Sequence, residues 1–153
     1  MFLMEEKLLS MLRREISERD VSAIIDSYES QKFDIATEVM EKIINIVGAC
    51  IKNVLDGDVK IRISREEYSK DPSIFYDKLL SVITIRPSAL VKDLILYHQC
   101  ANVGFIDALF YVVMHEYGHH QLNIMGVNPM KGVDSRRYII LYSKFEDYAI
   151  SRI

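Results

Sequence analysis

Two histidines and a glutamate in the second half of the chain have the types and spacing of a metal site. The run HEYGHH places His115 and His119 four residues apart, with Glu116 directly after the first histidine. On an α-helix, residues four apart share one face, with their Cβ atoms about 5–6 Å apart, so both imidazoles can reach one ion. Zinc accepts imidazole nitrogen in this way. The run therefore predicts Zn²⁺ bound by His115 and His119.

Glu116 suggests what chemistry this ion would serve. A residue one position after His115 is rotated by about 100° around the helix, so its carboxylate lies beside the ion. Bound zinc lowers the pKa of a water molecule to about 7, and an adjacent carboxylate can accept the proton as the water attacks a carbonyl. The motif predicts hydrolysis of peptide bonds, with Glu116 as general base and general acid.

A catalytic zinc site usually has three protein ligands, so a third must be found. The metzincin continuation would require a glycine and a histidine three and six residues after His119, but Leu122 and Met125 occupy these positions. No histidine follows His120. The third ligand is therefore expected among the carboxylates.

Three acidic residues follow the motif: Asp134, Glu146 and Asp147. On a helix, Glu146 shares its face with several apolar side chains, and a buried carboxylate is normally paired or bound to a metal. Asp147 shares its face with Ser143, Lys144 and Ser151, which suits solvent. We favour Glu146 as the third ligand, with Asp147 and Asp134 as alternatives.

The elements that must position these residues can be read from the hydrophobic spacing. Apolar residues three and four apart predict helices over about 2–19, 33–54, 88–97, 104–123 and 135–153. Asp71-Pro72 resembles a helix start and predicts a further short helix through Leu79 and Leu80. Alternating or β-branched residues predict strands over 59–63 and 81–86. The resulting fold class is α+β, mostly helical, with a small β-sheet.

At this point the sequence resembles a known family. HEYGH followed by Glu146-Asp147-Tyr148-Ala149 is similar to the HExxH…ExxA pattern of gluzincin metallopeptidases, and the short length is similar to the minigluzincins, some of which are latent zymogens. The resemblance covers residues 115–149. It implies a zincin-like fold with the sheet packed against the HExxH helix, a glutamate on the later helix as zinc ligand, a substrate-aligning strand, and a tyrosine or histidine that stabilises the oxyanion.

One position departs from this pattern. Many gluzincins carry an aspartate four residues after the ligand glutamate, where it orients the first histidine, but this chain has Ile150. Either Asp147, Asp107 or a backbone carbonyl replaces it, or the site is weaker than in typical members of the family. Metal binding is therefore predicted more firmly than catalysis.

Several other residues have two interpretations. Tyr138 and Tyr142 either donate a hydrogen bond to the oxyanion or belong to the core. His120, about 100° around the helix from His119, is expected to support the site or to face solvent, and His98 to be structural or exposed. The edge of strand 81–86 could pair with an extended peptide.

Composition sets the remaining expectations. The 153 residues suit one domain, 1–153, with a helical portion over 1–55 and the strands and zinc-site helices over 56–153. A net charge of −3 and the lack of a basic stripe argue against nucleic acid, and no apolar run is long enough for a membrane. Two cysteines without a CxxC spacing, and Glu5 and Glu6 near the start, favour the cytoplasm.

These features leave three hypotheses. The first is a zinc endopeptidase acting on peptide or protein substrates. The second is a latent or non-catalytic regulatory module that keeps the zinc ligands, with its cleft covered by its own chain or by a partner. The N-terminal helices could form such a cover, although completing the core is the favoured interpretation. The third is a helical scaffold whose HExxH is accidental.

Overall fold

The computed structural model describes residues 3–55, 59–66, 70–100 and 102–124. In this part of the chain, five helices accompany a small three-stranded sheet, in the order α1 (Leu3–Glu15), α2 (Glu18–Glu29), α3 (Phe33–Val54), β1 (Lys60–Ile63), β2 (Ile74–Asp77), β3 (Val82–Ile85), α4 (Pro87–Cys100) and α5 (Phe105–Ile124). The predicted class, α+β and mostly helical with a small sheet, is confirmed. The predicted helix over 135–153 lies outside the described residues.

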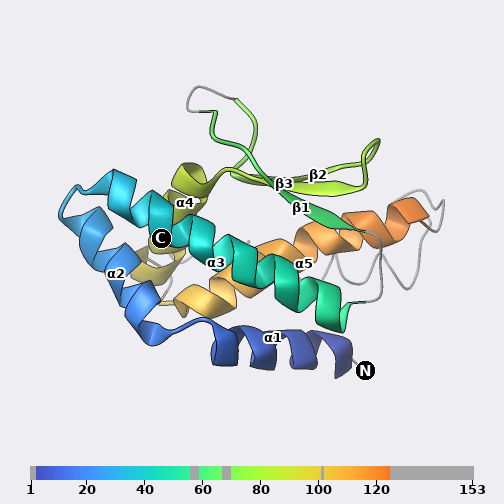
Figure 1. Cartoon of the computed structure of the whole chain (residues 1–153), viewed down its shortest axis with the longest axis horizontal. Coiled ribbons are helices and arrows are strands. Elements are labelled where there is room, and N and C mark those ends of the chain that lie inside the picture. The colour runs from blue at the N-terminus through green and yellow to red at the C-terminus, as the bar shows by residue number, and fades with distance from the viewer. Residues whose placement is uncertain (1–2, 56–58, 67–69, 101, 125–153) are drawn as a thin grey trace.

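The sheet has the strand order β1-β3-β2, with β1 parallel and β2 antiparallel to β3. Figure 1 shows the sheet on one side of α3 and α5, with α1 on the other side of these two helices. β2 lies along α5, and β1 lies along α3. The sheet therefore covers the helix that carries the HExxH motif.

Two local predictions are wrong. The N-terminal helix ends at Glu15, because the Ser17 hydroxyl accepts a hydrogen bond from the Asp20 backbone N–H and starts a second helix, α2. The segment expected to form a short helix after Asp71-Pro72 forms β2 instead. Its residues Ile74 to Asp77 pair in register with Val82 to Ile85, so tertiary pairing overrides the apparent helix start.

A four-residue turn, 78–81, joins β2 to β3. The Asp77 carboxylate accepts hydrogen bonds from the backbone N–H groups of Leu79 and Leu80, and Ser81 adopts a φ of 53°. These features are typical of a tight turn. The two leucines, through which the short helix was expected to run, are exposed in this turn.

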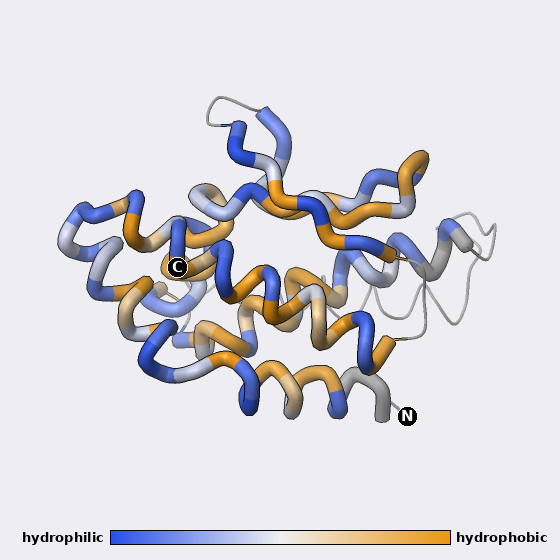
Figure 2. The backbone as a smooth tube through the Cα atoms, in the orientation of Figure 1, coloured by the Kyte–Doolittle hydropathy of each residue, from blue (hydrophilic) through white to orange (hydrophobic). Residues whose placement is uncertain are grey.

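The hydrophobic core is one cluster to which every described helix contributes, together with β2 and β3. Leu8 and Leu12 of α1 are fully buried, as are Met40 and Val47 of α3. Figure 2 shows hydrophobic and hydrophilic residues alternating along α1 and α3, the pattern expected of helices with one buried face. The described helices include none long and apolar enough to cross a membrane.

Candidate metal centre

The HExxH motif lies in the second half of α5, on the side of the helix that meets the sheet and α4. The preceding turns of α5 are apolar and anchor it: Leu109 and Val113 are fully buried, and Phe110 is nearly so. His115, Glu116 and His119 are half-buried. The helix therefore presents its polar residues at the boundary of the core, where solvent can still enter.

His115, Glu116 and His119 form a group that could hold a metal ion, because their candidate ligand atoms all lie within 4.8 Å of one another. The two imidazole ring centroids are 5.0 Å apart, with the rings at 77°. This spacing follows directly from positions four apart on one helical face. The prediction that these residues cluster is confirmed, whereas the identity of the metal remains a prediction.

The electrostatics of the two histidines suit metal binding. Burial, and next the neighbouring charge of His119, lower the pKa of His115 from 6.5 to about 4. Burial also lowers the pKa of His119. A metal binds the neutral imidazole, so a lowered pKa reduces competition from protons. Both residues therefore fit the role of neutral nitrogen donors at neutral pH.

The remaining predicted site residues lie outside the described part of the chain. These are the favoured third ligand, its alternatives and the two candidate oxyanion donors: Glu146, Asp147, Asp134, Tyr138 and Tyr142. Their roles remain predictions. Asp107, one candidate for orienting the first histidine, is instead bonded to Arg13 of α1 at 2.6 Å and lies in the first turn of α5, two turns before His115.

His120 is fully buried, so the prediction that it faces solvent is wrong, while a supporting role is consistent with its contacts. Its Nδ1 lies 2.9 Å from the hydroxyl of Tyr76 on β2. The side-chain amide of Asn123 donates to the same hydroxyl at 2.9 Å and to the carbonyl of Lys78 at 3.2 Å. These bonds fix β2 against the second half of α5.

His98 has the structural role expected of it. Its Nδ1 lies 3.1 Å from the carbonyl oxygen of Val103, so it links the end of α4 to the segment before α5. Since a carbonyl only accepts hydrogen bonds, Nδ1 carries the proton in this contact.

The strand next to the motif is β2, which corrects a prediction. Strand 81–86 was expected to offer an edge to a peptide, but β3 lies in the centre of the described sheet, with β1 and β2 paired to its two sides. β2 is an edge strand of this sheet and is bonded to α5 through Tyr76. An edge beside the motif therefore belongs to β2.

A cavity of about 300 Å³ opens beside the motif, between the start of β2, α4 and α5. His115 and Glu116 form part of its wall, and Asp93 of α4 also lines it. The sequence analysis missed Asp93. The signal was present, because Asp93 lies on the same helical face as Leu90 and Tyr97, which is the kind of pattern that singled out Glu146 in the sequence.

A buried arginine positions the rim of this cavity. Arg86 is 8% exposed, and its guanidinium donates to the carbonyl oxygens of Asp71 at 2.6 Å and of Glu66 at 3.4 Å. The backbone N–H of Arg86 donates to the carbonyl of Ser73 at 2.7 Å. Arg86 thereby holds the segment that leads into β2 against the end of β3.

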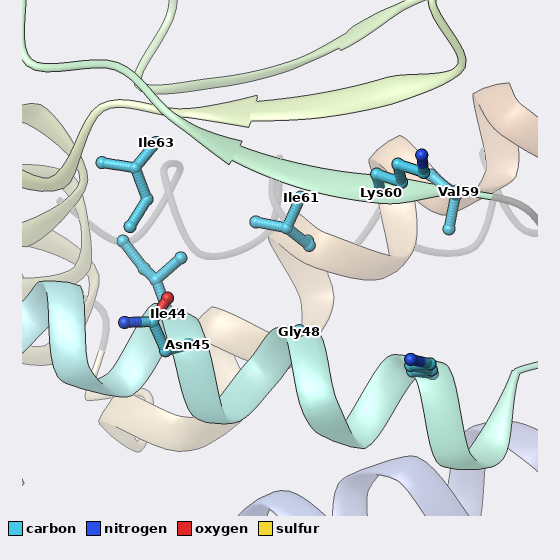
Figure 3. A pocket seen from close by; sticks show the side chains of 8 residues that line it. Ile44, Asn45, Gly48, Val59, Lys60, Ile61 and Ile63 are labelled. Carbon is cyan, nitrogen blue, oxygen red and sulfur yellow. The ribbon is translucent and has the colours of Figure 1, made fainter.

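A larger cavity, of about 590 Å³, lies between α3 and β1. Figure 3 shows Ile44 of α3 opposite Ile61 and Ile63 of β1, with the polar lining supplied by Asn45 and two lysines. Among the described residues, neither a histidine nor a carboxylate lines it. The chemistry of the described residues is therefore concentrated at the smaller cavity beside the motif.

Comparisons of the chain with protein-family models, with curated proteins and with solved structures gave no match.

Proposed function

We propose that the chain is a zinc-dependent metallopeptidase with a gluzincin-like His/His/Glu site. The observation that supports this most directly is the clustering of His115, Glu116 and His119, with ligand atoms within 4.8 Å, on one half-buried helical face. Helical geometry alone brings the two imidazoles together, so the setting carries the further support: burial lowers the pKa of both histidines, and a cavity opens beside His115 and Glu116. The zincin-like arrangement of the sheet over this helix is part of the same proposal.

In this mechanism, His115 and His119 hold the ion and Glu146 completes its ligand set. Zinc bound there would polarise the carbonyl of a peptide bond and lower the pKa of a water molecule. Glu116 takes the proton from the attacking water and delivers it to the leaving amine. Tyr138 or Tyr142 donates a hydrogen bond to the oxyanion that develops on the carbonyl.

The edge of β2 aligns the substrate in this proposal. An extended peptide that pairs with an edge strand gains main-chain hydrogen bonds that do not depend on its side chains. β2 is held against α5 by the Tyr76 hydroxyl, so a peptide on its edge would run beside Glu116 and the two histidines. The substrate class is therefore a peptide or an extended segment of a protein.

The first experiment tests the role of Glu116. Protein purified without chelator is analysed for zinc, and cleavage of a mixed peptide library is compared between the wild type and Glu116→Gln. We expect about one zinc per chain in both proteins and a loss of at least ~100-fold in cleavage in the variant, because it lacks the proton acceptor. Glu38→Gln, an exposed position on α3, should leave both unchanged. Unchanged cleavage in Glu116→Gln would refute the mechanism.

A second experiment tests the third ligand. Removing one of three protein ligands should lower zinc affinity far more than removing a solvent-facing carboxylate. We therefore expect Glu146→Ala to lose zinc during dialysis under conditions in which Asp147→Ala retains it. Equal retention by the two variants would exclude Glu146 as a ligand.

The alternative function is a latent or non-catalytic module that binds zinc. Ile150 favours it, because an aspartate that orients the first histidine is absent at this position. Stoichiometric zinc without cleavage of any peptide in the library would support this alternative over the peptidase. In either case we expect a cytoplasmic protein, an expectation supported by the unpaired state of Cys50 and Cys100.

A further inference from the structure

The cavity beside the motif has two carboxylate residues, Asp93 and Glu116, in a lining that is otherwise largely apolar or aromatic. Asp93 lies on α4, and the apolar residues of the lining include Leu90, Val112 and Ile74. A volume of about 300 Å³ is at the lower end for ligand pockets and suits one long side chain.

Asp93 is held in place, and no cation among the described residues pairs with it. The Ser73 hydroxyl donates a hydrogen bond of 2.5 Å to its Oδ2, which fixes the orientation of the carboxylate. In the described ranges of the chain, none of the ion pairs involves Asp93, although it is half-buried. Arg86, which anchors the same segment, turns to backbone carbonyls and does not line the cavity. A half-buried carboxylate without a counter-ion is costly unless a ligand supplies one.

We propose that this cavity selects substrates by taking the side chain of a lysine or arginine, with Asp93 as the residue that determines specificity. The aliphatic part of such a side chain would pack on Leu90 and Val112, and its cationic head would reach Asp93. Phe75 and Tyr97 also line the cavity, and aromatic residues provide a favourable environment for a cation. This inference rests on the proposed function, because it assigns a substrate preference to the same site.

The test measures binding separately from cleavage. The peptides are acetylated and amidated, and they differ at one central position, which is lysine, norleucine or glutamate. They are titrated into metal-free protein, in which no turnover occurs. A charge-assisted hydrogen bond predicts that the lysine peptide binds about 10- to 100-fold more tightly than the norleucine peptide. The glutamate peptide should bind most weakly. This comparison within the wild type does not depend on any variant folding.

The variant Asp93→Asn then assigns the preference. Asparagine can still accept the Ser73 hydrogen bond through its amide oxygen, so the fold should persist while the charge is lost. We expect the lysine and norleucine peptides to bind this variant within about threefold of each other. Asp26→Asn, an exposed position on α2, removes the same charge elsewhere and should keep the full preference.

The outcomes distinguish the proposed role of Asp93 from the proposed peptidase activity. The inference is overturned if the lysine and norleucine peptides bind the wild type equally, or if neither binds measurably. In that case, cleavage of the norleucine peptide by zinc-loaded protein would still support the peptidase. A preference that survives in Asp93→Asn also overturns it. Tighter binding of a norleucine peptide with a free amino terminus than of the acetylated lysine peptide would contradict a side-chain site. A preference that depends on Asp93, without any cleavage, supports the cavity assignment and refutes the peptidase.

Discussion

The Tyr76 hydroxyl joins β2 to α5 and is the contact on which the edge strand depends. It lies within hydrogen-bond distance of buried His120 and of Asn123. Tyr76→Phe leaves His120 without this partner in a buried environment, so we expect the free energy of unfolding to fall by about 1–3 kcal/mol. Urea denaturation measures the change.

A matched control exists on α2. The ring of Tyr28 packs edge-on against Phe33 with centroids 5.1 Å apart, and no hydrogen bond of its hydroxyl is seen among the described residues. Tyr28→Phe should therefore change stability by no more than about 0.5 kcal/mol. Equal losses in the two variants would show that the Tyr76 hydroxyl does not contribute to stability.

Protonation of His115 should make the metal-free protein sensitive to mild acid. Its pKa is about 4 in the fold, because of burial and then of His119, compared with 6.5 in the unfolded chain. Between these values the unfolded state binds more protons, so stability is lost as pH falls from about 6.5 toward 4 and is unaffected by this group above that window. Urea denaturation at pH 7.5 and pH 5 measures the loss.

The variant His115→Asn identifies the group responsible. Because asparagine does not titrate, we expect a smaller loss of stability between pH 7.5 and pH 5 in this variant than in the wild type. The same loss in both proteins would mean that His115 does not carry the pH dependence.

At the scale of elements, the start of α2 depends on a single side chain. The Ser17 hydroxyl accepts from the Asp20 N–H at 3.1 Å, one of the backbone donors that a helix N-terminus leaves unsatisfied. Ser17→Ala should lower the free energy of unfolding by about 1 kcal/mol, measured by thermal or urea denaturation.

Ser22 provides the control within the same helix. It is exposed in the interior of α2, where alanine has the higher helix propensity. Ser22→Ala should therefore be neutral or slightly stabilising. A loss of similar size in both variants would exclude a special role for the cap.

At the scale of the whole molecule, α1 belongs to the core. Leu8 and Leu12 are completely buried, Ile16 is 2% exposed, and Arg13 bonds to Asp107 of α5. A detachable cover would bury less apolar surface against the rest of the chain. The packing favours the interpretation in which the N-terminal helix completes the fold.

Leu12→Ala distinguishes the two interpretations. As a core substitution, it should lower the free energy of unfolding by about 2–5 kcal/mol without raising peptidase activity, whereas a cover that is loosened should release activity. Ser10→Ala, exposed on the same helix, serves as the control. Increased cleavage by Leu12→Ala would support self-inhibition by α1.

Local patterns in the sequence were sufficient for several parts of the fold and of the site. The spacing of His115 and His119 determines that they share a helical face, because helical geometry alone brings positions four apart together. The long apolar periodicity of α3 and the alternation of β1 were likewise read correctly, since each reflects one buried face.

The tertiary structure decided what depends on contacts between distant segments. Residues 74–77 form a strand because they pair with β3, although their local signals suggested a helix. His120 is buried because β2 lies over α5, and Asp93 lines one cavity with His115 and Glu116 because α4 packs against α5. Sequence spacing cannot specify such neighbours, since these residues are brought together by the packing of the elements rather than by the period of any one of them.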